Sequence, residues 1–191
     1  MDIRVENAVK RFDGQTVLDH VSLVFKQGEV SCLMGRSGIG KTTLLNLLMG
    51  FLSPDEGSVS GVPDKVACVF QEDRLLERFS AKDNLRFVLG KRADESLLCR
   101  HLALLGFEKG DMAKPVSALS GGMRRRVALA RAVLYNADLL LLDEAFKGLD
   151  EETRRTAIRY VLEHTRGKTV IAVTHEPEEA RLLGARIVMM E

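Results

Sequence analysis

The feature that most constrains this chain is a glycine-rich segment at residues 35–42, with the sequence Gly-Arg-Ser-Gly-Ile-Gly-Lys-Thr. It follows a short apolar run at 30–34, which is typical of a buried strand, and precedes a leucine-rich run at 41–49 that Gly50 ends. The order of strand, loop and helix, together with the spacing G-x-x-x-x-G-K-[ST], is what a phosphate-binding loop requires. A glycine turn before an ordinary helix would leave Lys41 unexplained.

The residue types in this loop suit a nucleoside triphosphate. Glycines let successive backbone N–H groups face an anion, and the following helix adds the partial positive charge of its N-terminus. Lys41 would reach the outer phosphates, and the Thr42 hydroxyl can ligate Mg²⁺. The predicted nucleotide-binding residues of the loop are Gly35, Arg36, Ser37, Gly38, Ile39, Gly40, Lys41, Thr42 and Thr43.

Two carboxylates, Asp143 and Glu144, follow the apolar run at 139–142. Ligands of α/β sheets bind at the carboxyl ends of the strands, so two acids at that position indicate chemistry. We expect Asp143 to hold Mg²⁺, directly or through water, and Glu144 to polarise the attacking water as a general base. The alternative is a pair of solvated charges that merely end a strand.

The remaining pattern predicts an α/β fold with a mainly parallel sheet covered by helices, an N-terminal antiparallel β flap and an inserted helical subdomain. Alternating residues with turn signals at 13–14 and 27–28 indicate the flap within 3–34. The predicted later elements are a turn at 53–57, a strand at 65–70, two or three helices within 80–119, helices at 121–135, 151–165 and 177–183, and strands at 139–142, 169–174 and 186–190. We expect one domain over 1–191, with a core at 1–71 and 136–191 and a helical subdomain at 72–135.

Composition excludes several classes of function. The chain has 191 residues with 28 basic and 27 acidic side chains, so no electrostatic case for nucleic acid follows. Its longest apolar runs fall far short of the roughly 20 residues that span a bilayer, and its start resembles no signal peptide. Cys32, Cys68 and Cys99 are widely spaced, which predicts buried free thiols.

A resemblance becomes specific at residues 119–123, Leu-Ser-Gly-Gly-Met, which closely match the LSGGQ signature of ATP-binding-cassette proteins. The segment lies between the two nucleotide motifs, as it does in that family. The resemblance implies a P-loop ATPase that uses ATP and Mg²⁺. Gly148-Leu149-Asp150 also resembles a family motif, the D-loop, which implies a dimer contact for Asp150.

Three further residues take roles from the same resemblance. Phe12 resembles the aromatic that stacks on adenine, Gln71 the glutamine that contacts Mg²⁺ and water, and His175 the switch histidine. The implied catalytic set is therefore Glu144, His175 and Gln71, and the implied metal set is Thr42, Gln71 and Asp143. Taken singly, Phe12 could be an ordinary flap aromatic, Gln71 a polar loop residue and His175 a helix-start histidine. His20, His101 and His164 are assigned surface or structural roles.

The resemblance also implies partners. Ser120 would cap a helix whose Gly121 and Gly122 amides face outward, an anion site that cannot fold back onto its own loop. In the family two cassettes close head to tail, so Ser120, Gly121 and Gly122 would bind the ATP of a second, identical subunit. A membrane permease would dock at Gln71–Ser80, with a solute-binding protein beyond it, which places the chain in the cytoplasm on the inner face of the membrane.

The run Met-Arg-Arg-Arg-Val-Ala-Leu-Ala-Arg at 123–131 resembles importer subunits for nitrate, sulfonate and related compounds, which favours import. A cassette ATPase of DNA repair or translation, a P-loop kinase and a regulatory ATP-binding module are the alternatives. Residues 124–126 predict a solvated basic face, with contact to nucleotide or permease as the sharper alternative.

The departures from the family pattern are Met123, Ala145 and Glu176, where glutamine, proline and aspartate are usual. We expect Ala145 to loosen the turn after Glu144 and to affect the turnover rate. The end at Glu191 leads us to expect no fused sensor domain.

Overall fold

The computed structural model describes residues 1–90 and 93–191. These residues form two compact units. The first contains Met1–Val66, Asp138–Asp143 and Gly167–Glu191, and the second contains Ala67–Ala137 and Glu144–Arg166. The predicted division into a core and a 72–135 helical subdomain stays a prediction, and the second unit also includes residues 144–166.

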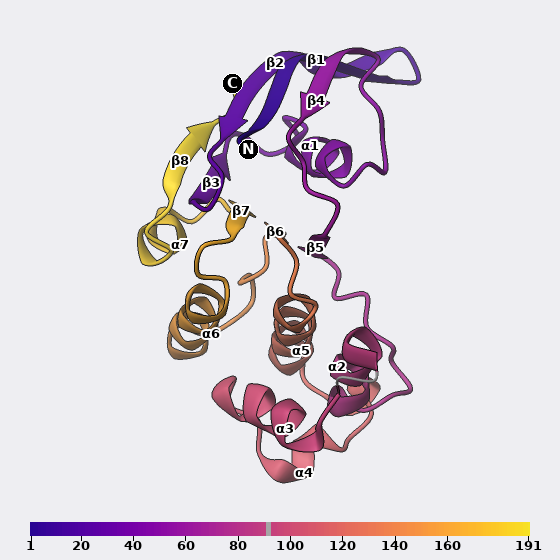
Figure 1. Ribbon diagram of the computed structural model, residues 1–191, viewed down its shortest axis with the longest axis vertical. Helices are drawn as coiled ribbons and strands as arrows, with labels where there is room; N and C mark the ends of the chain where they lie inside the picture. Colours follow the sequence, from indigo (N-terminus) through magenta and orange to yellow (C-terminus); the bar gives the residue numbers. More distant parts are fainter. Residues whose placement is uncertain (91–92) are drawn as a thin grey trace. The chain divides into compact units, whose positions relative to one another are not determined.

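The first unit contains an antiparallel sheet of three strands, β1 (Ile3–Phe12), β2 (Gln15–Phe25) and β4 (Glu56–Ser60), in the order β2-β1-β4 (Figure 1). The predicted β flap is therefore confirmed. The predicted turn at 53–57 is wrong at its end, because Glu56 and Gly57 already belong to β4. Gly57 has φ 79°, and a Cβ on it would lie 2.2 Å from the Asn7 carbonyl oxygen, so the glycine allows β4 to approach β1.

The first unit also holds four parallel strands in the order β6-β7-β3-β8. They are β3 (Val30–Met34), β6 (Leu139–Asp143), β7 (Thr169–Val173) and β8 (Arg186–Met189). β6 and β7 are buried along their whole length, as the continuous apolar runs predicted. Val173 of β7 pairs with Asp143 on one side and with Leu33 on the other. The carboxyl ends of β6, β7 and β3 therefore lie together at one edge.

Two helices belong to the first unit, α1 (Lys41–Leu48) and α7 (Pro177–Leu182). The predicted first helix is one residue too long, because Met49 is its C-cap. Gly50 follows with φ 70°, the left-handed conformation that commonly ends a helix. Pro177 occupies the first turn of α7, as predicted.

The second unit begins in β5 (Val66–Val69) and is otherwise mostly helical (Figure 1). Its helices are α2 (Ala81–Leu89), α3 (Glu95–Leu104), α4 (Lys109–Met112), the short 3₁₀ helix η2 (Val116–Ala118), α5 (Gly121–Leu134) and α6 (Glu151–His164). α2 packs against both α3 and α5, and α5 packs against α6. The predicted inserted helices are thus confirmed.

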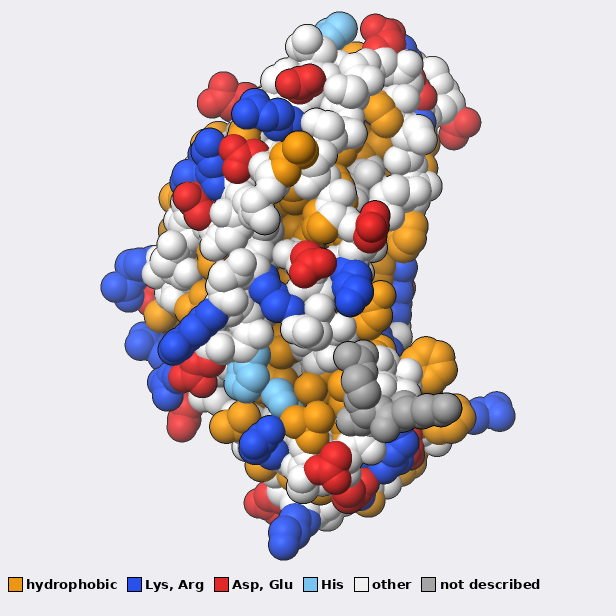
Figure 2. Space-filling view, in the orientation of Figure 1, with side chains coloured by type: hydrophobic (Ala, Val, Ile, Leu, Met, Phe, Trp, Pro, Cys, Tyr) orange, Lys and Arg blue, Asp and Glu red, His pale blue; other side chains and the backbone are white. Residues whose placement is uncertain are grey.

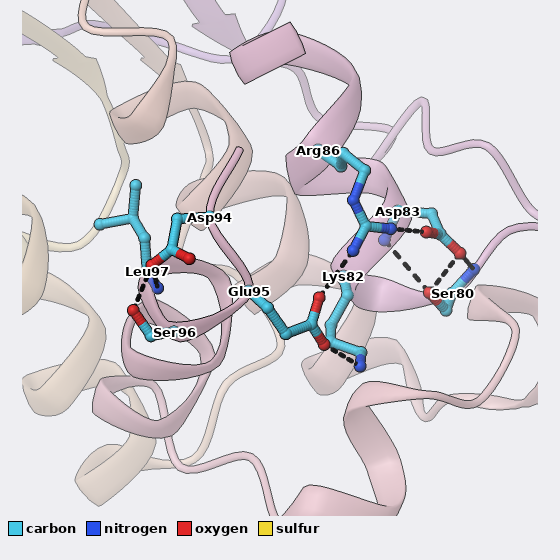
Figure 3. Close-up of polar contacts among 8 residues, drawn as sticks. All are labelled: Ser80, Lys82, Asp83, Arg86, Asp94, Glu95, Ser96 and Leu97. Atoms are coloured by element: carbon cyan, nitrogen blue, oxygen red, sulfur yellow. Dashed lines mark hydrogen bonds and ion pairs between the residues drawn. The ribbon is translucent and has the colours of Figure 1, made fainter. Parts of the chain in front are cut away.

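Polar contacts fix the start of α2 and join it to α3 (Figure 3). The Ser80 hydroxyl accepts the N–H of Asp83, and the Asp83 carboxylate accepts the backbone N–H of Ser80, which makes a capping box. Arg86 pairs with Asp83 and also with Glu95 of α3. Lys82 pairs with the same Glu95 carboxylate. The four charges therefore join α2 to the first turn of α3.

A buried ring cluster joins α3 to α6 within the second unit. His101 Nδ1 lies 2.8 Å from the Tyr160 hydroxyl, and the His101 and His164 ring centroids are 4.9 Å apart. His101 is only 6% exposed. Burial, and then the nearby His164 and Arg100, lower the pKa of His101 to about 4. The structural role predicted for His101 is confirmed.

The three cysteines are free. Cys32 is fully buried, and this burial, followed by the charge of Glu179, raises the pKa of its thiol to about 11. Cys68 and Cys99 are only half-buried, so the expectation of burial is wrong for these two.

On the face drawn in Figure 2, acidic and basic side chains are interspersed. Within residues 1–90 and 93–191, none of the helices combines the length and apolar character needed to cross a bilayer.

Candidate nucleotide-binding site

The glycine-rich loop at 35–40 joins β3 to α1, and its glycines are required by geometry. Gly38 and Gly40 have φ of 79° and 103°, in the left-handed region that strains other residues. A Cβ on Gly40 would lie 2.6 Å from Leu18 Cδ2, and one on Gly35 would lie 2.6 Å from the Met190 carbonyl oxygen. The backbone of the loop can therefore pass close to β2 and to the end of β8 only without these side chains.

Lys41, the first residue of α1, reaches back across the loop. Its Nζ donates to the carbonyls of Gly35 and Arg36, each at 2.8 Å, and the residue is only 7% exposed. The ammonium group is thus held against the start of the loop that leads into α1, and the dipole of that helix would also attract an anion. This arrangement suits a phosphate group.

Thr42 and Asp143 come from distant parts of the sequence and meet at the same edge. The Thr42 hydroxyl donates to Asp143 Oδ2 at 3.3 Å, and Asp143 is 5% exposed at the end of β6. One hydroxyl and one carboxylate oxygen are the kind of ligands that Mg²⁺ uses in proteins, with substrate phosphates and water completing its octahedron. The residues therefore fit a nucleotide-bound magnesium ion.

His175 lies one residue beyond Thr174, after the end of β7. Its side chain is exposed, whereas Thr174 is buried and its hydroxyl accepts the N–H of Glu176 at 3.0 Å. Because β7 is the neighbour of both β6 and β3, His175 follows the same strand edge as Asp143 and the glycine-rich loop. The fold thus brings three of the predicted motifs together within the first unit.

Phe12 is the last residue of β1 and is 40% exposed. It pairs with Gln15 at the start of β2, the strand whose Val17 and Leu18 pack against Gly40 of the loop. The ring is therefore an accessible aromatic surface on the strand pair that contacts the loop. Lys10 Nζ lies 5.7 Å from the ring centroid.

Glu144 opens the second segment of the second unit, Glu144–Arg166, and has an unusual backbone. Its φ is 47°, a left-handed conformation that costs energy for a non-glycine residue and that recurs at functional sites. The side chain is 16% exposed, and its carboxylate accepts from Lys147 Nζ at 2.6 Å. Ala145 is buried, and the turn is closed by the Lys147 N–H, which donates to the Glu144 carbonyl. No pattern in the sequence indicates the Lys147 contact.

Ser120 is the N-cap of α5, as predicted. Its hydroxyl accepts the N–H of Met123 at 3.3 Å, and the first turn of the helix contains no acidic residue. A Cβ placed on Gly121 would meet no atom within 4 Å, and one on Gly122 would only touch Leu149. The amide end of this 14-residue helix is therefore open to an anion.

Asp150 is the N-cap of α6, and its carboxylate accepts the N–H of Thr153 at 2.9 Å. This bond, and more weakly the charge of Arg126, lower the pKa of Asp150. The structure thus gives Asp150 a helix-capping role, and its dimer contact stays a prediction.

The basic run at 124–126 is not the solvated face that the sequence predicted. Arg125 donates to the carbonyl of Phe70 at 2.6 Å and to that of Gln71. Arg126 donates to the Leu105 carbonyl at 2.6 Å and lies over the Phe107 ring. The prediction failed because helical periodicity indicates which face of α5 is apolar. It does not indicate that arginines beside that face bind backbone carbonyls of other segments.

The comparisons with known proteins agree with this geometry. Residues 18–147 match the family model described as ABC transporter, and the chain belongs to that family. It is an ATP-binding-cassette ATPase. It is 40% identical to the taurine import ATP-binding protein TauB of Ruegeria pomeroyi, over 98% of this chain and 77% of that protein. It is also 40% identical to the aliphatic sulfonates import ATP-binding protein SsuB 1 of Streptomyces avermitilis, over 99% of this chain and 73% of that protein.

The fold is similar to that of solved cassettes. The dimeric post-hydrolysis structure of the ATP-binding cassette MJ0796, bound to ADP and Pi, superposes with a TM-score of 0.86 at 27% identity. The match covers 99% of this chain and 94% of that one. A second dimeric structure of MJ0796, described as a bacterial ABC transporter cassette, gives a TM-score of 0.85 at 28% identity. The predicted α/β P-loop fold is confirmed.

Proposed function

We propose that this chain is the ATPase subunit of an importer, which hydrolyses Mg²⁺-ATP to drive a solute through a separate membrane permease. The contact between Thr42 and Asp143 carries the proposal, because it joins the glycine-rich loop to the acidic strand end in the arrangement that phosphoryl-transfer sites use. Thr42 and Asp143 would hold Mg²⁺, with Gln71 as a further ligand. The ion would neutralise charge that develops on the phosphates.

Each other predicted residue has one task in this site. Residues 35–43 bind the phosphates, Phe12 stacks on the base, and Glu144 orients and polarises water as the general base. His175 would stabilise the γ-phosphate. Its exposed position after β7 leaves the ring accessible to such a ligand.

The site is completed by a second copy of the chain. The open amide end of α5, at Ser120, Gly121 and Gly122, supplies anion binding to the ATP held by the partner, and Asp150 lies at the dimer contact. The dimeric state of the similar MJ0796 structures supports a pair. In this proposal ATP closes the two subunits head to tail, and hydrolysis releases them.

Import is favoured by the relatives, which are named as import ATP-binding proteins for taurine and aliphatic sulfonates. Import proteins for spermidine/putrescine and for sulfate/thiosulfate are also similar, at 36% and 39% identity. We therefore take a small sulfonate as the first solute to test. The subunit would sit on the cytoplasmic face of the membrane, bound to the permease, with a solute-binding protein on the other side.

The test is transport by a reconstituted complex. The chain is purified from detergent-solubilised membranes together with the membrane protein that remains bound to it. The complex is placed in proteoliposomes with ATP on the side of the ATPase. We expect taurine or an alkanesulfonate to move toward the ATP side, and a Lys41→Ala complex to show no uptake. ATP hydrolysis by the chain with no associated permease and no uptake of any anion would refute the importer and leave a non-transport cassette.

A further inference from the structure

We propose that Arg125 is a positioning residue for ATP hydrolysis, which fixes the backbone of Gln71 to the signature helix α5. The inference rests on the proposed role of Gln71 at the magnesium ion. The sequence pattern predicted only a basic face or a nucleotide or permease contact for residues 124–126, and the comparisons assign no role to Arg125.

The contacts of Arg125 match the shape of a guanidinium group. Its two Nη atoms donate to the successive carbonyls of Phe70 and Gln71, the first at 2.6 Å. Its Nε lies 3.2 Å from Asp73 Oδ1, and the side chains of Arg125 and Asp73 are only 11% and 14% exposed. Asp73 is thus an ion-pair partner of Arg125, while the hydrogen bonds go to the two carbonyls. The planar guanidinium can direct two Nη donors at successive carbonyls, whereas a lysine offers a single ammonium.

Neighbouring arginines hold the residues that follow. Arg131, two turns further along α5, donates to the carbonyls of Asp73 and Arg74 at 3.3 and 2.9 Å. Arg124 pairs with Glu77 at 3.3 Å and approaches Asp73 at 3.8 Å. The segment from Phe70 to Glu77 is therefore held to α5 by side chains of that helix, which bind four of its carbonyls and the Glu77 and Asp73 carboxylates.

The other end of the same segment is fixed to α2. Asn84, which is fully buried, accepts the N–H of Leu76 and donates to the carbonyls of Leu76 and Ser80. The N–H groups of Val116 and Ser117 donate to the carbonyls of Phe79 and Glu77. Residues 70–80 thus form no helix or strand beyond the isolated bridge between Ser80 and Pro115. Their path is determined by side chains and by the start of η2.

Of all these contacts, only those of Arg125 act on Gln71 itself. A hydrogen bond to its carbonyl, together with one to the preceding carbonyl, restricts the peptide plane from which the Gln71 side chain projects. A misplacement of about 1 Å at a reacting centre can cost roughly a hundredfold in rate. Any movement of α5 would also be transmitted to Gln71 through this group.

The test compares Arg125→Gln with Arg124→Gln in the full chain. Both variants remove one charge from the same helix, but only the first loses the bonds to the Phe70 and Gln71 carbonyls. We expect Arg125→Gln to lower kcat for Mg²⁺-ATP hydrolysis by about 10- to 100-fold while KM and magnesium-free ATP affinity stay within about twofold. Arg124→Gln is expected to keep kcat within about twofold. Arg125→Lys keeps the charge and is expected to restore only part of the rate.

A double-variant cycle separates positioning from general stability. In a Gln71→Ala background, Arg125→Gln is expected to cause no further loss of kcat, because its effect acts through the missing side chain. Equal losses for Arg124→Gln and Arg125→Gln, or fully additive losses with Gln71→Ala, would overturn the inference. A Gln71→Ala protein with an unchanged rate would instead refute the proposed role of Gln71, and the inference with it. If Arg125→Gln does not fold, the same cycle is carried out with Arg125→Lys.

Discussion

The two units of this protein position their functional groups by different means. In the first unit the backbone does so: parallel strand ends, left-handed glycines and the start of α1 place Lys41, Thr42 and Asp143. In the second unit long side chains do so, since arginines of α5 hold the segment at 70–77 through its carbonyls. A site positioned by the backbone is encoded in short sequence motifs. A site positioned by side chains depends on contacts between residues more than fifty positions apart in the sequence.

This difference has a consequence for mutation. Substitutions in the first unit should change nucleotide binding, because the substituted side chains are those proposed to contact the phosphates or the base. Substitutions in the second unit should change turnover or folding, because the substituted side chains hold other residues in place. The following expectations test that contrast.

The largest effect is expected for Glu144→Gln, at the point where the chain passes from the first unit to the second. The change keeps the side-chain volume but removes the charge that polarises water. We expect the rate of ATP hydrolysis to fall by about 10²–10⁴-fold, the range associated with a general base, while ATP still binds. Phosphate release and equilibrium nucleotide binding measure the two properties.

The same variant should accumulate as an ATP-dependent dimer, because the nucleotide that bridges two subunits is not cleaved. Sedimentation with ATP and Mg²⁺ would show this, and adding Ser120→Arg should dissolve the dimer. Wild-type hydrolysis by Glu144→Gln would exclude Glu144 as the base.

The next effect concerns folding of the second unit. The pKa of His101 is lowered to about 4 from an ordinary value of 6.5, so the unfolded chain binds more protons between these limits. The free energy of unfolding should therefore decrease as pH falls from about 6.5 to 4, by up to roughly 3 kcal/mol from this residue. Urea unfolding at a series of pH values measures it.

The matched control is His101→Gln, which keeps a polar partner for the Tyr160 hydroxyl but cannot take up a proton. Carboxylates also titrate near pH 4. The informative quantity is therefore the difference between wild type and His101→Gln in how steeply the free energy of unfolding changes with pH. Identical slopes would mean that His101 is not held neutral by burial.

In the first unit, Lys41→Ala should abolish tight ATP binding. The ammonium group is the cation directed at the outer phosphates, and a hydrogen bond to a charged group contributes about 1.5–3 kcal/mol. We expect ATP affinity to fall at least tenfold, with the fold intact by circular dichroism. Calorimetry that shows undiminished affinity would rule out the loop as the phosphate site.

The smallest effect is expected for Phe12→Ala, which should weaken ATP binding by roughly 1–3 kcal/mol if the ring stacks on adenine. Replacement of the exposed Phe51, also in the first unit, serves as a control for general loss of an aromatic. Equal affinity in the Phe12→Ala and wild-type proteins would make Phe12 an ordinary residue of the flap.

The sequence by itself predicted most of the first unit. The spacing of the glycine-rich loop requires backbone positions that only glycine occupies without strain, and the continuous apolar run at 139–142 requires a buried strand that ends at Asp143. The helix cap at Ser120 was also predicted, because a cap acts on an N–H only three residues away. Such local requirements leave a pattern in the sequence.

Only the tertiary structure revealed the contacts of Arg125, Asn84 and Lys147, and the strand that begins at Glu56. Every residue has a backbone carbonyl that can accept a hydrogen bond, whatever its side chain. The sequence therefore does not indicate which carbonyls an arginine will bind. The sequence pattern placed Gly57 in a turn. In the structure it lies in β4, where the close approach to the Asn7 carbonyl leaves no room for a side chain. These features depend on which segments pack together, and packing is decided by the whole fold rather than by neighbours in the chain.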